Sequence, residues 1–500
     1  MEWSFSDFLV FFALLCLTTL IFNRRHSRTG GNHRPPGPLA WPIVGNIFDL
    51  GNLPHQILYE LKFKYGPVIW LRLGFTNTLV IQSAKAAEHL FKNHDVPFSD
   101  RKVSDAFTAR SYSEGSLAVC RYGSNWRMLR RLVTLELTAG KKVIESVNIR
   151  RKCIDKMIRF IEEDAAEART RGESGEIMLS RYVFVMTFNL IGNLVFSRDL
   201  LDSHSEEGSV FLEAMNNFIK WSGKPNLADF FPFLKVFDPQ RIRKNMEMAL
   251  ERTMNIVEKF MKERIEERKE RETKDFLDSV LEFEGDNKMS TRNMIIIIME
   301  IFFGGTETTS GTIDWIMAEL FRNPHSMERV KEELNRVIGP KRKVEESDID
   351  ELPYLQAVIK ESMRLHPVIP FLIPRKTTEE TKFMEYVIPK DTQVFVNAWA
   401  IGRDPEDWED PLSFNPERFL GSNIDYRGQN FELIPFGSGR RICMGMALAH
   451  RILHLTVGSL LHSFDWEFHP EATDMKEKLG FTIKKLVPLK AIPKIKEIVE

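Results

Sequence analysis

Residues 435–445 have the sequence PFGSGRRICMG, and this stretch decides the fold. Its glycines and proline predict a tight, irregular loop. The apolar run ALAHRILHLTVGSLL (447–461) that follows has helical spacing, which places Cys443 at a helix N-terminus. Helix-end N–H groups, the helix dipole and the neighbouring Arg440 and Arg441 would stabilise a thiolate there. Cys443 is therefore predicted to be an anionic ligand.

The other cysteines offer no competing site. Cysteines occupy positions 16, 120, 153 and 443, and no two have the C-x-x-C spacing of a zinc site or redox dithiol. This spread argues against a disulfide framework and suits a reducing compartment. We interpret Cys16, Cys120 and Cys153 as ordinary structural cysteines.

The Cys443 loop also matches a known pattern. Phe436, Gly439, Arg441, Cys443 and Gly445 fill all five fixed places of F-x-x-G-x-R-x-C-x-G. At average residue usage, a chance match in a chain of this length has a probability on the order of 10⁻⁴. The loop resembles the haem-binding loop of the cytochrome P450 superfamily. The resemblance implies a mainly α fold with small β-sheets, a haem b whose iron is ligated by Cys443, and the activation of O2.

Cationic side chains upstream match family positions that hold the haem carboxylates. Trp126 and Arg130 have W-x-x-x-R spacing, one helical turn apart, so the indole N–H and the guanidinium are expected to reach the same edge. Arg375 and Arg441 match two further positions, and with Phe436 they complete the predicted cofactor contacts. Arginine stays charged and can bind a carboxylate bidentately. Taken singly, each is an ordinary surface arginine; the set favours a carboxylate clamp.

The sequence GGTETT (304–309) interrupts a strongly apolar helix. Two adjacent glycines cost roughly 1 kcal/mol each relative to alanine, so the backbone is expected to lie close to something, here dioxygen and the porphyrin face. An ordinary role for Thr308 is a bond back to the i−4 carbonyl. The resemblance instead assigns Glu307 and Thr308 to proton delivery, as the catalytic pair.

Glu361 and Arg364 match the family's E-x-x-R motif and share one helix face. Arg418, in FNPERF (414–419), resembles the third member of the same family network. We predict a buried Glu361–Arg364–Arg418 cluster with a structural role.

Periodicity predicts a mainly helical body, 43–500, with few strands. The sequence at 65–82 predicts a β-hairpin, and 381–395 is a second strand-rich stretch. Helical spacing is found at 126–137, 251–270, 289–321, 327–338 and 355–365, among other segments.

The N-terminus predicts a membrane anchor (1–23) followed by a basic, proline-rich hinge (24–42). The run FLVFFALLCLTTLIF (8–22) carries no charge, and basic residues follow it at 24, 25 and 28. A cleaved signal peptide has its positive charge first, so we expect an uncleaved single-pass anchor with the body facing the cytosol. No later segment was expected to span a bilayer. The resemblance places the anchor in the endoplasmic reticulum.

The source of electrons must be another protein, because no nicotinamide or flavin fingerprint is evident. Microsomal members of the family use an NADPH-dependent flavoprotein reductase, and Arg127, Arg131 and Arg440 are candidate docking charges. The formal net charge of −1 gives no indication of nucleic acid binding.

The chain most resembles plant monooxygenases, in the branch that contains geraniol 8-hydroxylase and iridoid oxidase. This implies a small apolar substrate, a monoterpenoid or iridoid, contacted by 98–122, 216–225, 297–308, 368–373 and Phe481. An alkaloid, phenolic or diterpene substrate stays open. So do a reductase-independent haem-thiolate isomerase or dehydratase, and a haem-binding sensor.

Overall fold

The computed structural model describes residues 34–201, 206–267, 274–283 and 289–495. The predicted anchor, 1–23, and the first part of the hinge lie outside the described residues. Residues 34–40, which belong to the predicted hinge, form neither helix nor strand.

Helices make up most of the fold. They are α2 (Pro54–Tyr65), α3 (Ala84–Glu88), α4 (Tyr112–Gly115), α5 (Ser124–Val133), α6 (Gly140–Glu145), α7 (Val147–Thr170), α8 (Leu179–Phe196), α9 (Glu206–Ser222), α10 (Leu227–Phe230), α11 (Ile242–Glu267), α12 (Phe276–Leu281), α13 (Thr291–Arg322), α14 (Pro324–Val337), α15 (Pro353–Leu365), α16 (Ala398–Ile401) and α17 (Met446–Ser463).

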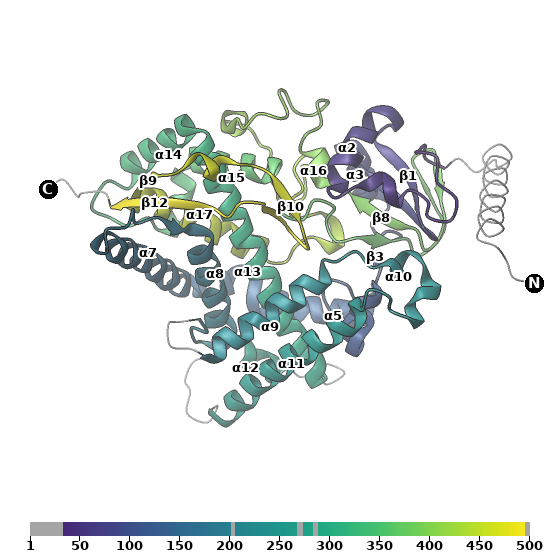
Figure 1. The fold of residues 1–500 in the computed structure, drawn as a ribbon, viewed down its shortest axis with the longest axis horizontal. Helices are drawn as coiled ribbons and strands as arrows, with labels where there is room; N and C mark the ends of the chain where they lie inside the picture. The colour runs from purple at the N-terminus through teal and green to yellow at the C-terminus, as the bar shows by residue number, and fades with distance from the viewer. Residues whose placement is uncertain (1–33, 202–205, 268–273, 284–288, 496–500) are drawn as a thin grey trace, which may run out of the picture.

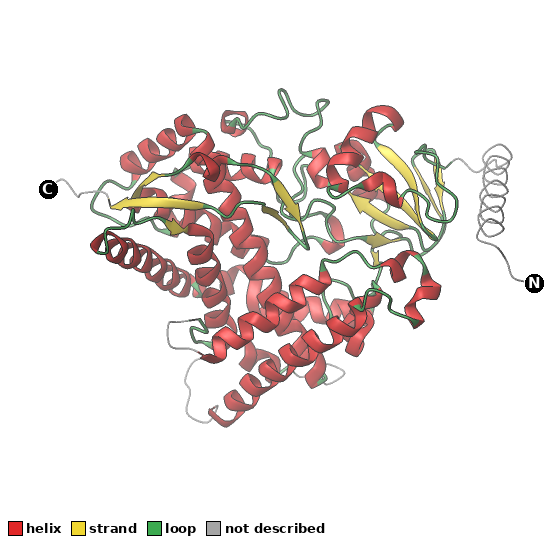
Figure 2. Cartoon of the chain, in the orientation of Figure 1, coloured by secondary structure: helices red, strands yellow, loops and turns green. Residues whose placement is uncertain are grey.

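The strands form small sheets, as expected. They are β1 (Val68–Leu73), β2 (Thr76–Ile81), β3 (Asp100–Arg101), β4 (Ile177–Met178), β5 (Arg375–Lys376), β6 (Thr381–Phe383), β7 (Tyr386–Ile388), β8 (Gln393–Val396), β9 (Phe464–Glu467), β10 (Glu477–Leu479), β11 (Ile483–Lys485) and β12 (Lys490–Ile495). The largest sheet has the order β1-β2-β8-β5-β3. Its β1–β2 pair, with Val68 opposite Ile81, confirms the predicted hairpin. Figure 2 shows this sheet on the side of the molecule where the described chain begins.

The predicted helices are present, with shifted ends. The segment 126–137 divides into α5 and a π-turn at Thr134–Thr138. The segment predicted from 251 begins earlier, at Ile242, because Ile242, Met246 and Leu250 already form a buried stripe at i, i+4 and i+8.

The long helix α13 runs through the middle of the molecule (Figure 1). It packs along α8 and contacts α11, α15 and α17. Helix α8 is itself long and apolar enough to cross a membrane, which corrects the expectation that no later segment is. Most of it is buried, however, against α13 and α7, as a core helix would be.

Candidate haem-thiolate site

Cys443 lies three residues before the first residue of α17, at the N-terminal end of that helix. The residue has accessible surface, yet burial raises the pKa of its thiol. The backbone N–H groups of Gly445 and Met446, at the start of α17, and the guanidinium of Arg130 act in the opposite direction and lower that pKa. These groups favour the thiolate, but burial outweighs them, and the pKa of the free thiol is raised overall. The nearby cation is Arg130, however, and not Arg440 or Arg441.

The loop geometry explains this difference. The guanidinium of Arg441 turns away from the sulfur and donates to the carbonyls of Ser99 and Cys120, at 3.0 and 2.7 Å. The Arg440 guanidinium lies 3.6 Å from Asp95. Phe436 supports the loop through its carbonyl, which accepts the N–H of Cys443 at 3.0 Å.

The adjacent glycines of α13, Gly304 and Gly305, serve different purposes. Gly304 is exposed in the middle of a helix whose neighbouring residues are largely buried, and an added Cβ would meet nothing within 4 Å. Gly304 therefore borders an open space, as expected of a helix kept clear for a planar group. At Gly305 a Cβ would lie 2.6 Å from the Ile191 side chain. This glycine lets α8 approach, so the expectation that both glycines face the cofactor is wrong for Gly305.

Four arginines lie close enough to depress one another's ionisation. Burial lowers the pKa of Arg101, and the charges of Arg441, Arg375 and Arg130 lower it further. Arg101 and Arg375 stand directly opposite each other across strands β3 and β5, an arrangement that is unfavourable for like charges. Asp95 lies 3.0 Å from Arg375, but no carboxylate forms an ion pair with the other three guanidiniums in the described part of the chain.

This excess of buried positive charge fits the two carboxylates of a haem. The structure brings the predicted Arg130, Arg375 and Arg441 together, and it adds Arg101, which the sequence analysis missed. Nothing local distinguishes Arg101. Only its pairing with Arg375, far away in the sequence, reveals it.

Trp126 differs from its predicted role. Its indole N–H donates to the carbonyl of Leu117, at 3.2 Å, and so does not point to the same edge as the Arg130 guanidinium. Its ring instead lies beneath the guanidiniums of Arg130 and Arg441, at 5.5 and 4.2 Å from the ring centroid. Trp126 therefore supports the arginines through cation–π contacts.

Leu117 links this cluster to α13. Its carbonyl accepts hydrogen bonds from Trp126 and Arg441, and its N–H donates to Glu300 of α13 at 2.6 Å. Glu300 also accepts hydrogen bonds from Ser116 and Tyr112. These contacts of Glu300 were not predictable from the sequence, because the partners lie on different elements.

Glu307 and Thr308 do not hydrogen bond to each other through their side chains. Thr308 donates to the carbonyl of Gly304 at 2.5 Å, which is the ordinary role considered above. Glu307 is only 3% exposed, and its Oε1 accepts from Thr482 at 2.9 Å and lies 2.7 Å from Nζ of Lys484. Gly304 and Thr308, at i and i+4, share one face of α13, and both retain accessible surface.

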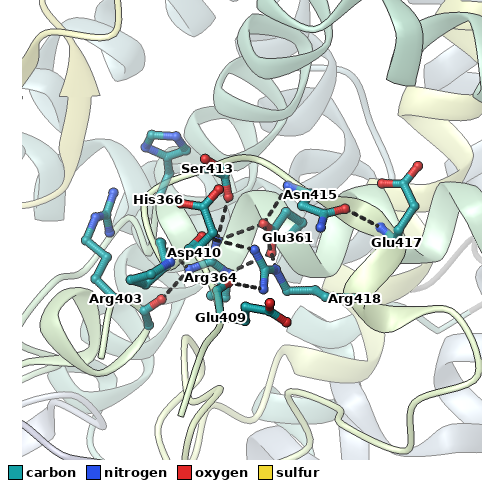
Figure 3. A network of polar contacts seen from close by, with 12 residues as sticks. Glu361, Arg364, His366, Arg403, Glu409, Asp410, Ser413, Asn415, Glu417 and Arg418 are labelled. Atoms are coloured by element: carbon teal, nitrogen blue, oxygen red, sulfur yellow. Dashed lines mark hydrogen bonds and ion pairs between the residues drawn. The ribbon is translucent and has the colours of Figure 1, made fainter. Parts of the chain in front are cut away.

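The predicted Glu361–Arg364–Arg418 network is confirmed (Figure 3). Arg364 binds Glu361 bidentately, at 2.6 and 2.7 Å, and Arg418 donates to the same carboxylate at 3.1 Å. Glu361 and Arg364 are 0% and 1% exposed. Arg364 also donates to the carbonyls of Gly402, Pro411 and Ser413, which fastens the segment before the Cys443 loop to α15.

A cysteine at a helix N-terminus, together with a cluster of mostly buried arginines that lacks matching carboxylates, is the arrangement expected of a haem-thiolate protein. Comparison with known families agrees: residues 35–489 match the family described as Cytochrome P450. The chain belongs to this family, and it is a monooxygenase that uses a thiolate-ligated haem, O2 and electrons derived from NADPH.

Relatives cover nearly the whole chain. The chain is 53% identical to iridoid oxidase of Catharanthus roseus, over 94% of this chain and 93% of that protein. It is 40% identical to geraniol 8-hydroxylase of the same plant, over 92% and 93%. Identity to 7-ethoxycoumarin O-deethylase of Helianthus tuberosus is 41%, over 92% and 94%. The predicted resemblance to the branch with iridoid oxidase and geraniol 8-hydroxylase is confirmed.

Proposed function

We propose that this monooxygenase oxidises a small monoterpenoid or iridoid alcohol or lactol with electrons from a flavoprotein reductase. The observation that carries the haem-thiolate part of the proposal is Cys443 at the start of α17, with the Arg130 guanidinium near its sulfur. The 53% identity to iridoid oxidase favours an iridoid substrate, whereas geraniol 8-hydroxylase, at 40%, and the coumarin deethylase, at 41%, are equally distant from this chain.

Cys443 would hold the haem iron, and Arg101, Arg130, Arg375 and Arg441 would neutralise the haem carboxylates. The bound haem supplies the activation of O2, which an electron-donating thiolate favours. The ring of Trp126 would support Arg130 and Arg441, and the carbonyl of Phe436 would hold the N–H of Cys443.

The walls of the proposed substrate space are apolar. Leu117, Ile301, Ile373 and Phe481 are partly accessible side chains packed against the main core, and all lie in segments predicted to contact substrate. Such walls would orient a small hydrocarbon skeleton and exclude water.

Glu307 and Thr308 would deliver protons on the α13 side of the haem, where O2 would bind. Replacing Thr308 by valine keeps the shape and removes the hydroxyl, and Glu307→Gln removes the acid. We expect either change to slow product formation about 10²- to 10⁴-fold, the usual contribution of a positioned proton donor. Electrons should be diverted to hydrogen peroxide, measured as peroxide formed for each NADPH consumed.

Ser310→Ala is the matched control for these variants. The Ser310 hydroxyl donates to the carbonyl of Thr306 at 2.8 Å, on a buried face of the same helix. This variant should keep the peroxide ratio of the unmodified enzyme. An unchanged ratio in both Thr308→Val and Glu307→Gln would contradict the assignment.

The reductase would dock near the thiolate side, where Arg127 and Arg131 are exposed on α5 and the Arg440 side chain is 51% exposed. These charges suit an acidic protein surface.

The body would be held at the cytosolic face of the endoplasmic reticulum by an anchor at 1–23 and a hinge at 24–42. An exposed apolar patch supports this proposal. Trp41 and Ile43 adjoin the β1–β2 turn, where Phe75 contacts the Phe233 ring, and these side chains are 58%, 39%, 64% and 60% exposed. Phe237 is 75% exposed in the same segment as Phe233. A patch of this kind suits the interfacial region of a membrane.

Turnover with a reductase tests the function. Membranes containing the enzyme and a plant flavoprotein reductase, supplied with NADPH and ¹⁸O2, should convert geraniol or nepetalactol into products carrying one labelled oxygen. Product formed without NADPH and without label would instead support an isomerase or dehydratase. Binding without turnover of any terpenoid, alkaloid, phenolic or diterpene would support a sensor.

A further inference from the structure

The hairpin β10–β11 supplies the partners of Glu307. Thr482 lies in the turn and Lys484 on β11, and both contact Oε1 of the carboxylate, at 2.9 and 2.7 Å. Oε2 accepts no hydrogen bond from any residue that the structure describes. One carboxylate oxygen is therefore held by the hairpin, and the other is available to a different partner.

Lys484 connects a buried acid to solvent. Its side chain is 54% exposed, whereas that of Glu307 is 3% exposed. An ammonium group in direct contact favours the ionised carboxylate, and its removal would leave a buried charge without a counter-charge. Lys484 is therefore the counter-charge of Glu307 and helps to fix the orientation of its carboxylate.

The other charged groups near this pair are accounted for. Asp314 lies two turns further along α13, and burial raises its pKa to about 7; Lys484 and Lys485 lower that pKa, and Glu307 raises it. Lys485 directs its ammonium to the carbonyls of Ala472 and Asp474, at 3.0 and 2.5 Å. Of the two lysines, Lys484 is the direct partner of Glu307.

The tip of the hairpin lies against the proposed substrate space. Its Phe481 ring is 4.4 Å from the ring of Phe303, one helical turn before Glu307 on α13. Gly223 approaches so closely that an added Cβ would lie 2.4 Å from the N of Phe481. A substrate that displaces Phe481 would therefore also displace Thr482 and Lys484, which follow it directly.

We propose that Lys484 is a positioning residue for Glu307, and that the hairpin transmits substrate occupancy at Phe481 to this pair. With the site empty, Lys484 and Thr482 hold Oε1 of Glu307 against the hairpin. When substrate moves the hairpin, the carboxylate takes a proton from solvent, turns, passes the proton towards Thr308 and returns to its ionised form; Lys484 keeps its charge throughout. This inference rests on the proton-delivery role proposed for Glu307.

Infrared spectra of the resting protein provide a test that needs no turnover. The comparison is made in an Asp314→Asn background, because the pKa of Asp314 is about 7 and responds to both Lys484 and Glu307. At neutral pH, adding Lys484→Met to Asp314→Asn should produce a carbonyl stretch of a protonated carboxyl group, and adding Glu307→Gln as well should remove it. In the same background, Lys484→Arg should restore the spectrum of Asp314→Asn. Lys478→Met is the matched control, because Lys478 is exposed and stands directly opposite Lys484 across the hairpin.

Coupling provides the second measurement. Lys484→Met should release several-fold more peroxide for each NADPH in the absence of substrate, and its product formation should depend on pH differently from that of Lys484→Arg. Should Lys484→Met accumulate poorly, Lys484→Gln carries the same test. A Lys484→Met protein with no new band and an unchanged pH profile would overturn the inference, even if Glu307→Gln impairs turnover. If Glu307→Gln is itself fully active, the proton-delivery role fails instead.

Discussion

Cys443→Ala is expected to remove monooxygenase activity to background while leaving a folded polypeptide. The N–H groups of Gly445 and Met446 and the guanidinium of Arg130 favour the thiolate form of this sulfur, which is the form that ligates a haem iron. Alanine offers no ligand atom, so the reduced carbon monoxide complex should lose the red-shifted Soret band of a thiolate-ligated haem. Absorption spectra of purified protein measure this directly.

Cys153→Ala is the matched control. Cys153 is buried in α7, and burial raises the pKa of its thiol to about 12, so it is a neutral core group at physiological pH. Its removal leaves a small cavity and should not change the carbon monoxide spectrum. A thiolate-type band that persists in Cys443→Ala would refute the assignment of the ligand.

The second large effect is expected from Glu361→Ala. Without the carboxylate, Arg364 would keep its charge at 1% exposure and lose two hydrogen bonds, and Arg418 would lose one. Breaking a buried ion pair in this way costs about 3–5 kcal/mol. Because whole proteins are stable by only about 5–15 kcal/mol, little folded protein should accumulate. Denaturant titration followed by tryptophan fluorescence measures the loss.

Glu417→Ala is the matched control, because it removes a carboxylate from an ion pair that is exposed instead of buried. Glu417 is the neighbour of Arg418 in the chain and pairs with Arg329, but its side chain is 39% exposed. Exposed pairs contribute about 0–1 kcal/mol, so this variant should stay near the unmodified protein. Equal losses from the two variants would show that the Glu361 network has no special structural role.

Motifs short enough to lie on one loop or one helix were predictable from the sequence. The Cys443 loop is a local pattern followed by an amphipathic helix, and Glu361 and Arg364 share a helix face by spacing alone. The β1–β2 hairpin was equally accessible, because two apolar runs flank Gly74 and Asn77 in the sequence.

Contacts made between distant segments were not predictable. Arg101 meets Arg375 only because β3 pairs with β5, and Lys484 reaches Glu307 only because the β10–β11 hairpin lies against α13. The direction of the indole N–H was not predictable either. The spacing indicates that Trp126 lies beside Arg130, as it does, but its N–H donates to the Leu117 carbonyl. Residue spacing predicts which side chains share a face of one helix or strand. Which residues of other elements they contact depends on the tertiary packing.

The backbone at Leu117 belongs both to the proposed substrate space and to the arginine cluster. The carbonyl of Leu117 accepts hydrogen bonds from the side chains of Trp126 and Arg441, and its N–H donates to the carboxylate of Glu300 on α13. A substitution that shifts this short stretch to admit a bulkier molecule also disturbs the group of cations next to it. A substitution here that changes substrate choice would therefore also weaken haem binding. Substitutions that broaden substrate choice should be tolerated better in parts of the substrate space that do not contact the arginine cluster.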